Sequence, residues 1–137
     1  MSPADANRLQ EVYRREYRSL LQYAREASPY TSVPDRPVRD SVMRIANEES
    51  AALQSFGEVL ETNRVALPQL GSFPMNYTDL NFVTIRHLVP KLIAEQKRDV
   101  MKLESELPAF ADVIVRAAMQ KLVDLHQRHL KEMEAIG

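Results

Sequence analysis

The sequence predicts an all-α fold, a bundle of four helices in a single domain spanning residues 1–137. Apolar residues recur at steps of three and four along four long segments, which is the spacing of amphipathic helices. Only three residues of 137 are glycine, and this low count favours helices. Prolines at positions 29, 34 and 37, at 68 and 74, and at 108 mark the connections. These connections are short, long and short.

The first helix is expected over about residues 3–27. Ser2 precedes Pro3, a pairing typical of an N-cap followed by proline in the first turn. The apolar face of this segment contains one acid, Glu16, four residues after Val12 and four before Leu20. Glu16 is therefore expected to point towards the core, and residues 28–37 are expected to turn the chain back.

The second helix is expected over about residues 38–63. Its apolar stripe includes Ile45 and Phe56, and Glu49 falls on the same face. The neighbouring Glu48 falls on a different side of the helix and is expected in solvent. A long connection follows, and in a four-helix bundle such a connection runs the length of the molecule, so that the third helix lies parallel to the second. Its aromatic residues are expected to form either a lid over the bundle or a dimer contact.

The third helix is expected over about residues 79–106, capped by Thr78 and Asp79, with Leu92, Glu95 and Asp99 on its inner face. The fourth is expected over about residues 109–136, with Asp112 either as a cap or as an acid in the first turn. Two histidines, His126 and His129, lie one turn apart in its apolar stripe. A charged or ligating group on a buried face costs stability unless it has a partner. Inward polar residues on four helices therefore suggest a shared site in the core.

The composition excludes several classes of function. The net charge is −1 and no block of Lys or Arg is present, so neither nucleic acid nor a membrane surface is an expected partner. The absence of cysteine excludes disulfides, iron–sulfur clusters and thiol nucleophiles. No signal-peptide-like stretch and no run of about 18 apolar residues is present, so we expect a cytoplasmic protein.

The polar positions on the four predicted helices form a pattern that resembles the ferritin-like superfamily, in particular the rubrerythrin and bacterioferritin type. That family takes a Glu from the first helix, Glu-x-x-His from the second, Glu from the third and Glu-x-x-His from the fourth. The resemblance implies a ferritin-like four-helix bundle with a metal centre in its core. The implied ligands are Glu16, Glu49, Glu95, His126 and His129, with Asp99 as an additional carboxylate and Tyr23 as a neighbouring hydrogen-bond or radical partner.

Two positions depart from the family pattern. Ala52 stands where the second-helix histidine would be, and His126 stands where the fourth-helix glutamate would be. The remaining carboxylates and imidazoles fit one ion or a weak pair. These ligand types suit iron, manganese or zinc.

With iron, the implied reactions are Fe(II) oxidation and dioxygen or peroxide chemistry, and the lack of cysteine means that electrons would come from an external donor. The alternative is a non-enzymatic bundle without metal, in which a vestigial polar core fixes the register and the protein serves as a scaffold or interaction module. A homodimer is expected in either case.

Overall fold

The computed structural model describes residues 1–136 and is all-α, with no β-strand in that range. Its elements differ from the expected four helices in number and in bounds. The α-helices are α1 Pro3–Tyr17, α2 Leu20–Ala27, α3 Arg36–Thr62, α4 Ile85–Glu106 and α5 Val113–Ile136. Short 3-10 helices are η1 Val33–Asp35, η2 Met75–Leu80 and η3 Leu107–Ala109.

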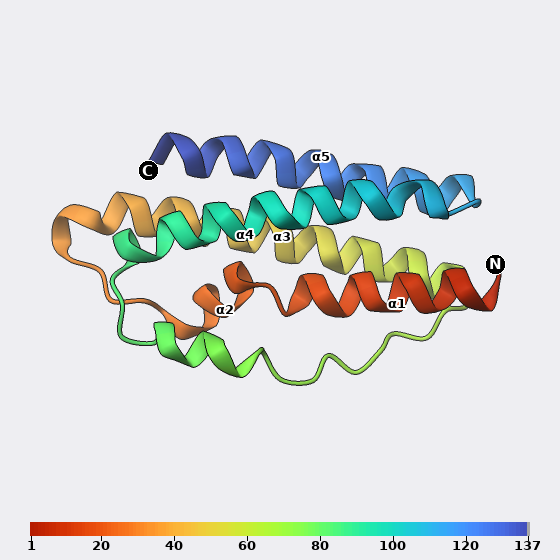
Figure 1. Cartoon of the computed structure of the whole chain (residues 1–137), viewed down its shortest axis with the longest axis horizontal. Coiled ribbons are helices and arrows are strands. Elements are labelled where there is room, and N and C mark those ends of the chain that lie inside the picture. Colours follow the sequence, from red (N-terminus) through yellow and green to blue (C-terminus); the bar gives the residue numbers. More distant parts are fainter. Residues whose placement is uncertain (137) are drawn as a thin grey trace.

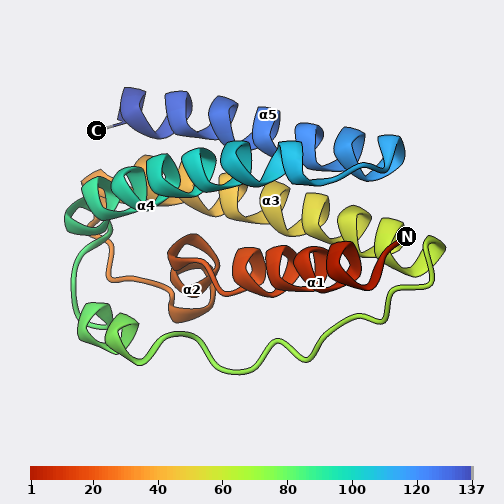
Figure 2. The same cartoon turned by 45° about the vertical axis from the view of Figure 1, so that its right-hand side comes forward.

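The long helices lie side by side along the length of the molecule (Figures 1 and 2). α2 follows α1 at an angle to it (Figure 1), and both helices pack on α3. α5 packs on both α3 and α4. α3 and α4 run in the same direction, opposite to α1 and α5, so the expected parallel arrangement is confirmed. The segment between α3 and α4 returns along α1 and α2 to make that direction possible.

The helix expected over residues 3–27 is divided into α1 and α2. Ser19 has extended backbone angles, φ −67° and ψ 158°, and its hydroxyl accepts a hydrogen bond from the Gln22 backbone N–H at 3.2 Å. A serine side chain that caps the next turn competes with continuation of the helix. The apolar stripe nevertheless resumes in α2, where Leu20, Leu21 and Ala24 are buried.

The third expected helix begins later than position 79. Residues 75–80 form η2, and α4 begins at Ile85, where the Thr84 hydroxyl accepts from the His87 backbone N–H. The predicted caps Ser2 and Asp112 are confirmed, because each accepts a hydrogen bond from a backbone N–H of the helix that follows it. Since Asp112 caps the final helix, α5 begins at Val113, and residues 107–109 form η3.

Some aromatic and apolar side chains of the long connection pack on the bundle, and others are exposed to solvent. Phe73 and Tyr77 pack against Tyr23 of α2, with ring centroids 5.3 and 5.5 Å apart from it. Met75 and Phe82 are exposed. The connection is therefore anchored on α2 by an aromatic group, and Val65, Leu70, Leu80 and Val83 pack on the two core clusters.

A layer of polar side chains separates two apolar clusters in the core. Along α1 the order is Val12 of the first cluster, Glu16, then Leu20 at the start of α2 in the second cluster. The other long helices cross the same boundary, and each has a buried polar residue between the two clusters. This polar layer consists of Glu16, Glu49, Gln96, His126 and His129, all of them buried.

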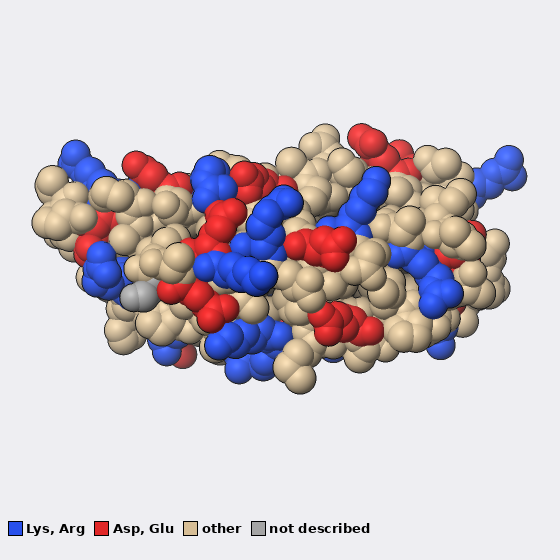
Figure 3. All heavy atoms as spheres, turned by 90° about the horizontal axis from the view of Figure 1, so that it is seen from above, with Lys and Arg blue, Asp and Glu red and all other residues tan. Residues whose placement is uncertain are grey.

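On the surface, Lys and Arg are interspersed with Asp and Glu over the face shown in Figure 3, and neither sign forms a continuous patch there. None of the helices within residues 1–136 is long and apolar enough to cross a membrane.

Candidate metal centre

A single imidazole nitrogen faces three carboxylates at the centre of the polar layer. His126 Nε2 lies 3.1 Å from Asp99 Oδ2, 3.2 Å from Glu16 Oε2 and 3.5 Å from Glu49 Oε1. These residues come from α1, α3, α4 and α5, and we call them the central cluster: Glu16, Glu49, Asp99 and His126. The side chains of Glu16 and His126 are 1% and 2% exposed. Four helices therefore bring their donors to one buried point.

The central cluster fits a metal ion on two observations. Donor atoms of Glu16, Asp99 and His126 all lie within 4.8 Å of one another. In addition, Glu16 Oε1 is buried without a hydrogen-bond partner. Buried polar atoms are usually satisfied, so a cation beside this carboxylate oxygen would complete its interactions. Carboxylate and imidazole together form a donor set used by iron, manganese and zinc.

Glu49 is held in place by two donors on the side away from His126. Its Oε2 accepts from His129 Nδ1 at 2.8 Å and from Gln96 Nε2 at 2.9 Å. Gln96 Nε2 also donates to the backbone carbonyl of His126 at 3.2 Å. Because Oε2 is occupied in this way, Glu49 presents Oε1 to the central cluster.

His129 bridges two carboxylates. Its Nδ1 donates to Glu49 and its Nε2 donates to Glu48 Oε2 at 2.6 Å. Both ring nitrogens must carry protons to donate to both carboxylates, which makes His129 an imidazolium. Burial opposes this charge, but the two carboxylates outweigh burial and raise the pKa of His129.

The central cluster holds more acid than its cationic neighbours can balance. Burial raises the pKa of Glu16 to about 8, with the charge of Asp99 adding to the rise and His126 opposing it. Burial would lower the pKa of His126, but Glu49, Asp99 and Glu16 raise it well above its usual value. For Asp99 burial is likewise opposed, and the hydrogen bond to His126 keeps its pKa low. Around neutral pH, protons therefore neutralise part of the site.

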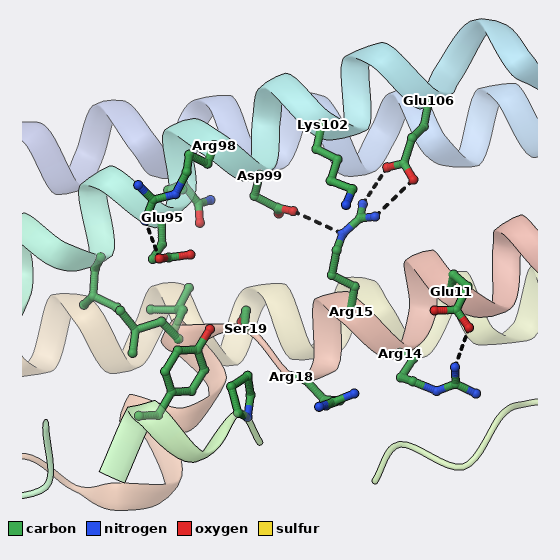
Figure 4. A pocket seen from close by; sticks show the side chains of 16 residues that line it. Glu11, Arg14, Arg15, Arg18, Ser19, Glu95, Arg98, Asp99, Lys102 and Glu106 are labelled. Carbon is green, nitrogen blue, oxygen red and sulfur yellow. Dashed lines mark hydrogen bonds and ion pairs between the residues drawn. The ribbon is translucent and has the colours of Figure 1, made fainter. Parts of the chain in front are cut away.

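Arg15 connects the central cluster to the surface. Its Nη2 lies 3.5 Å from Glu16 Oε1 and its Nε lies 3.7 Å from Asp99 Oδ1. The guanidinium also forms two hydrogen bonds to Glu106, at 2.6 and 3.0 Å, and this geometry fixes its orientation (Figure 4). Arg15 thus supplies a permanent positive charge at the edge of the site.

The structure places the site residues expected from the sequence in three different situations. Glu16, Glu49, Asp99 and His126 come together, and His129 adjoins them through Glu49 with both of its nitrogens engaged. Glu95 lies outside, with a side chain 42% exposed that pairs with Arg98 (Figure 4). The hydroxyl of Tyr23 donates to Asn81, so this tyrosine has no hydrogen bond to the central cluster.

Gln96, Glu48 and Arg15 were not expected at the site. Gln96 lies four residues after Leu92 and four before Val100, both buried, and this spacing is as helical as the one that selected Glu95. The spacing could therefore have identified Gln96. No comparable signal marks Glu48, whose side chain is 43% exposed, or Arg15.

Comparison with protein families, with curated proteins and with solved structures gives no match to this chain.

Proposed function

We propose that this protein is a ferritin-like metal-binding bundle that holds one divalent ion at the central cluster. The ligands would be Glu16, Glu49, Asp99 and His126. The observation that carries the proposal is the arrangement of three carboxylates, two of them fully buried, around one buried imidazole nitrogen.

The charges of the site support a cation as its natural occupant. Carboxylates that share a buried site cannot all ionise at low cost, and the raised pKa of Glu16 is one result. A divalent ion would replace protons on Glu16 and His126 and allow every carboxylate to ionise. Metal ligands must be deprotonated, so binding is expected to release protons.

The ferritin-like assignment is supported by the order and direction of the helices. A long connection between α3 and α4 makes these two helices parallel, as in bundles with one long crossover. Each long helix contributes to the polar layer. The departures from the family pattern are Ala52, Gln96 and His126, and they favour one ion over a pair.

The same donor set is compatible with iron, manganese and zinc. Iron at this site would supply Fe(II) oxidation and dioxygen or peroxide chemistry, with electrons from an external donor. The residues of the chain would bind the ion, exclude water and balance its charge. His129 and Gln96 would orient Glu49, and Arg15 lies beside Asp99.

A metal-free scaffold is the second candidate, and one observation favours it. Both nitrogens of His129, the Glu49 Oε2 atom and the Gln96 amide nitrogen are satisfied by hydrogen bonds without any ion. A hydrogen-bonded network of this kind needs no ion, because it can by itself specify how the helices pack.

Metal content distinguishes the two candidates. We expect protein purified without chelator, then supplied with Fe(II), Mn²⁺ or Zn²⁺, to hold one ion per chain. At a free metal concentration 100 times Kd, the ion should stabilise the fold by about 2.7 kcal/mol. Elemental analysis and thermal melting measure these two effects.

The matched variants are Glu16→Gln and His126→Gln, with Glu95→Gln as the control. The first two remove proposed ligands with little change of volume and should abolish both metal and the thermal shift. The third removes an acid of the same type outside the cluster and should leave both unchanged. If wild-type protein holds no metal after it has been supplied with Fe(II), Mn²⁺ or Zn²⁺, the metal site is rejected and the scaffold is supported.

A further inference from the structure

The four proposed ligands of the central cluster differ in how close they lie to solvent. The side chains of Glu16, Glu49 and His126 are at most 4% exposed, whereas that of Asp99 is 19% exposed. Asp99 is also the only one of the four that lines a cavity of about 630 Å³ between α1, the start of α2, η2 and α4 (Figure 4). The shortest way from solvent to the central cluster therefore ends at Asp99.

The approach to the central cluster from the side of α3 is blocked. Glu48 is exposed there, but the buried ring of His129 lies between Glu48 and Glu49 and donates to both carboxylates. Its positive charge would repel an approaching cation. A second hollow, between α3 and α5, is lined by none of the four proposed ligands. The cavity at Asp99 is thus the better route for an ion.

Arg15 lies where this cavity meets the central cluster. His126 Nε2 faces one oxygen of each of two carboxylates, Asp99 Oδ2 and Glu16 Oε2. Arg15 covers the other oxygen of each, with its Nε 3.7 Å from Asp99 Oδ1 and its Nη2 3.5 Å from Glu16 Oε1. A cation that approaches Asp99 from the cavity must therefore pass the guanidinium, and the two positive charges repel one another.

Glu106 holds Arg15 in this position. Its carboxylate accepts two hydrogen bonds from the guanidinium, at 2.6 and 3.0 Å (Figure 4). Paired hydrogen bonds of this kind fix the orientation of an arginine as well as its distance. Lys102, one turn before Glu106 on α4, extends towards the same guanidinium and adds positive charge beside it (Figure 4). Arg15 of α1 is thus fastened to α4 across the edge of the cavity.

We propose that the cavity is the path by which the ion enters and leaves the central cluster, and that Arg15, held by Glu106, closes this path. Entry and release require the guanidinium to turn away from Glu16 and Asp99. The inference rests on the proposed function, because it concerns the ion that the central cluster is proposed to hold.

The rate of ion release separates closure of the path from a simple effect of charge. If Arg15 acted only through its charge, it would repel the bound cation, and its removal would slow release. If Arg15 closes the path, its removal speeds both uptake and release. The two roles therefore predict changes of opposite sign in the release rate.

Stopped-flow measurement on the full chain tests the proposal. Protein loaded with Zn²⁺ is mixed with an excess of a chromogenic zinc chelator, and the release rate is taken where it no longer depends on chelator concentration. We expect Arg15→Gln to release Zn²⁺ about tenfold faster than wild type. Opening in the wild type breaks at least one charge-assisted hydrogen bond, which is worth roughly a factor of ten or more.

Two further variants make the test specific. Arg15→Lys keeps the positive charge but cannot form the paired hydrogen bonds to Glu106, so it should also release Zn²⁺ faster than wild type. It decides the question if Arg15→Gln does not fold. Arg14→Gln is the control, because Arg14 lies on the same helix, lines the same cavity and pairs with Glu11 outside the central cluster. Its release rate should equal that of wild type.

The outcomes distinguish failure of this inference from failure of the proposed function. If the Arg15 variants hold one Zn²⁺ per chain and release it at the wild-type rate or more slowly, the closure is overturned and the metal site remains. An equal acceleration in Arg14→Gln also overturns the closure, because the effect would then belong to the charge of the cavity in general. Wild-type protein that binds no Zn²⁺ at equilibrium removes the proposed function and this inference together.

Discussion

Among the single residues of the core, His126 is the one that faces the most ionisable partners. A buried imidazole with one carboxylate partner would be an ordinary ion pair, but here Nε2 faces three acids while Nδ1 has no hydrogen-bond partner. His129, one turn later, has a carboxylate on each nitrogen. The two histidines therefore have different roles: His126 faces the point where the donors converge, and His129 orients one of the donors.

The pH dependence of stability follows from Glu16. Its pKa is about 8 in the folded protein against 4.5 when unperturbed, so the folded state binds this proton more tightly than the unfolded state. The stabilisation is complete below about pH 4.5 and is lost as the pH rises towards 8. The raised pKa of His126 acts in the same direction. We expect the Tm of metal-free protein to fall between pH 6 and pH 9.

Thermal melting in chelator across this range checks the expectation, with Glu16→Gln as the comparison. Glutamine imitates the protonated acid, so the Tm of this variant should depend less on pH. A Tm that rises with pH in the wild type would contradict the assignment of a protonated Glu16.

His129 is expected to be important for stability even if no metal binds. His129→Gln removes the cation between Glu48 and Glu49 and leaves a buried carboxylate with Gln96 as its remaining donor. Breaking a buried ion pair from one side costs about 3–5 kcal/mol. Glu48→Gln is the control, because the Glu48 side chain is 43% exposed and its loss should cost about 1 kcal/mol or less. Urea denaturation measures the free energy of unfolding of both variants. Equal losses would show that the buried pair of His129 with Glu49 is worth no more than its exposed pair with Glu48.

At the scale of elements, periodicity located the inner face of every long helix but left neighbouring positions on α4 unresolved. Glu95 is three residues after Leu92 and Gln96 is four, and both steps are compatible with 3.6 residues per turn. The structure selects Gln96, which packs between Glu49 and the backbone of α5, while Glu95 turns to Arg98. Asp99, one turn after Gln96, is thereby brought to His126.

The division between α1 and α2 depends on the Ser19 cap. Ser19→Ala removes the side-chain acceptor for the Gln22 backbone N–H, and loss of an N-cap costs about 1 kcal/mol. Ser55→Ala on the exposed surface of α3 is the control, and it should be neutral or slightly stabilising because alanine is the better helix former. Chemical denaturation of both variants gives the comparison. A neutral Ser19→Ala would show that packing alone sets the break.

At the scale of the whole molecule, the polar layer interrupts an otherwise apolar core between two clusters. If the polar layer exists to bind an ion, it should lower the free energy of unfolding of the metal-free protein. Replacing a buried ionic group by apolar residues of similar volume is often stabilising, by about 1–4 kcal/mol. We expect the triple variant Glu16→Met, Asp99→Leu, His126→Leu to be more stable than metal-free wild type and to bind no metal.

The triple variant leaves the bonds of Glu49 to His129 and Gln96 intact, and Arg15 keeps Glu106 as its partner. Urea denaturation in chelator and elemental analysis measure the two effects. A large loss of stability would instead indicate that the central cluster itself specifies the packing of the helices.

The all-α class, the inward faces of the helices and the long connection could be predicted from the sequence, because helical periodicity and proline placement are local properties of the chain. It also identified Glu16, Glu49, Asp99 and His126 as candidates. The packing of the helices was needed to show that Gln96 takes the place of Glu95 and that both nitrogens of His129 are engaged. These outcomes depend on how the packed helices place neighbouring side chains, and a spacing of three or four residues along one helix cannot choose between two adjacent positions on its inner face.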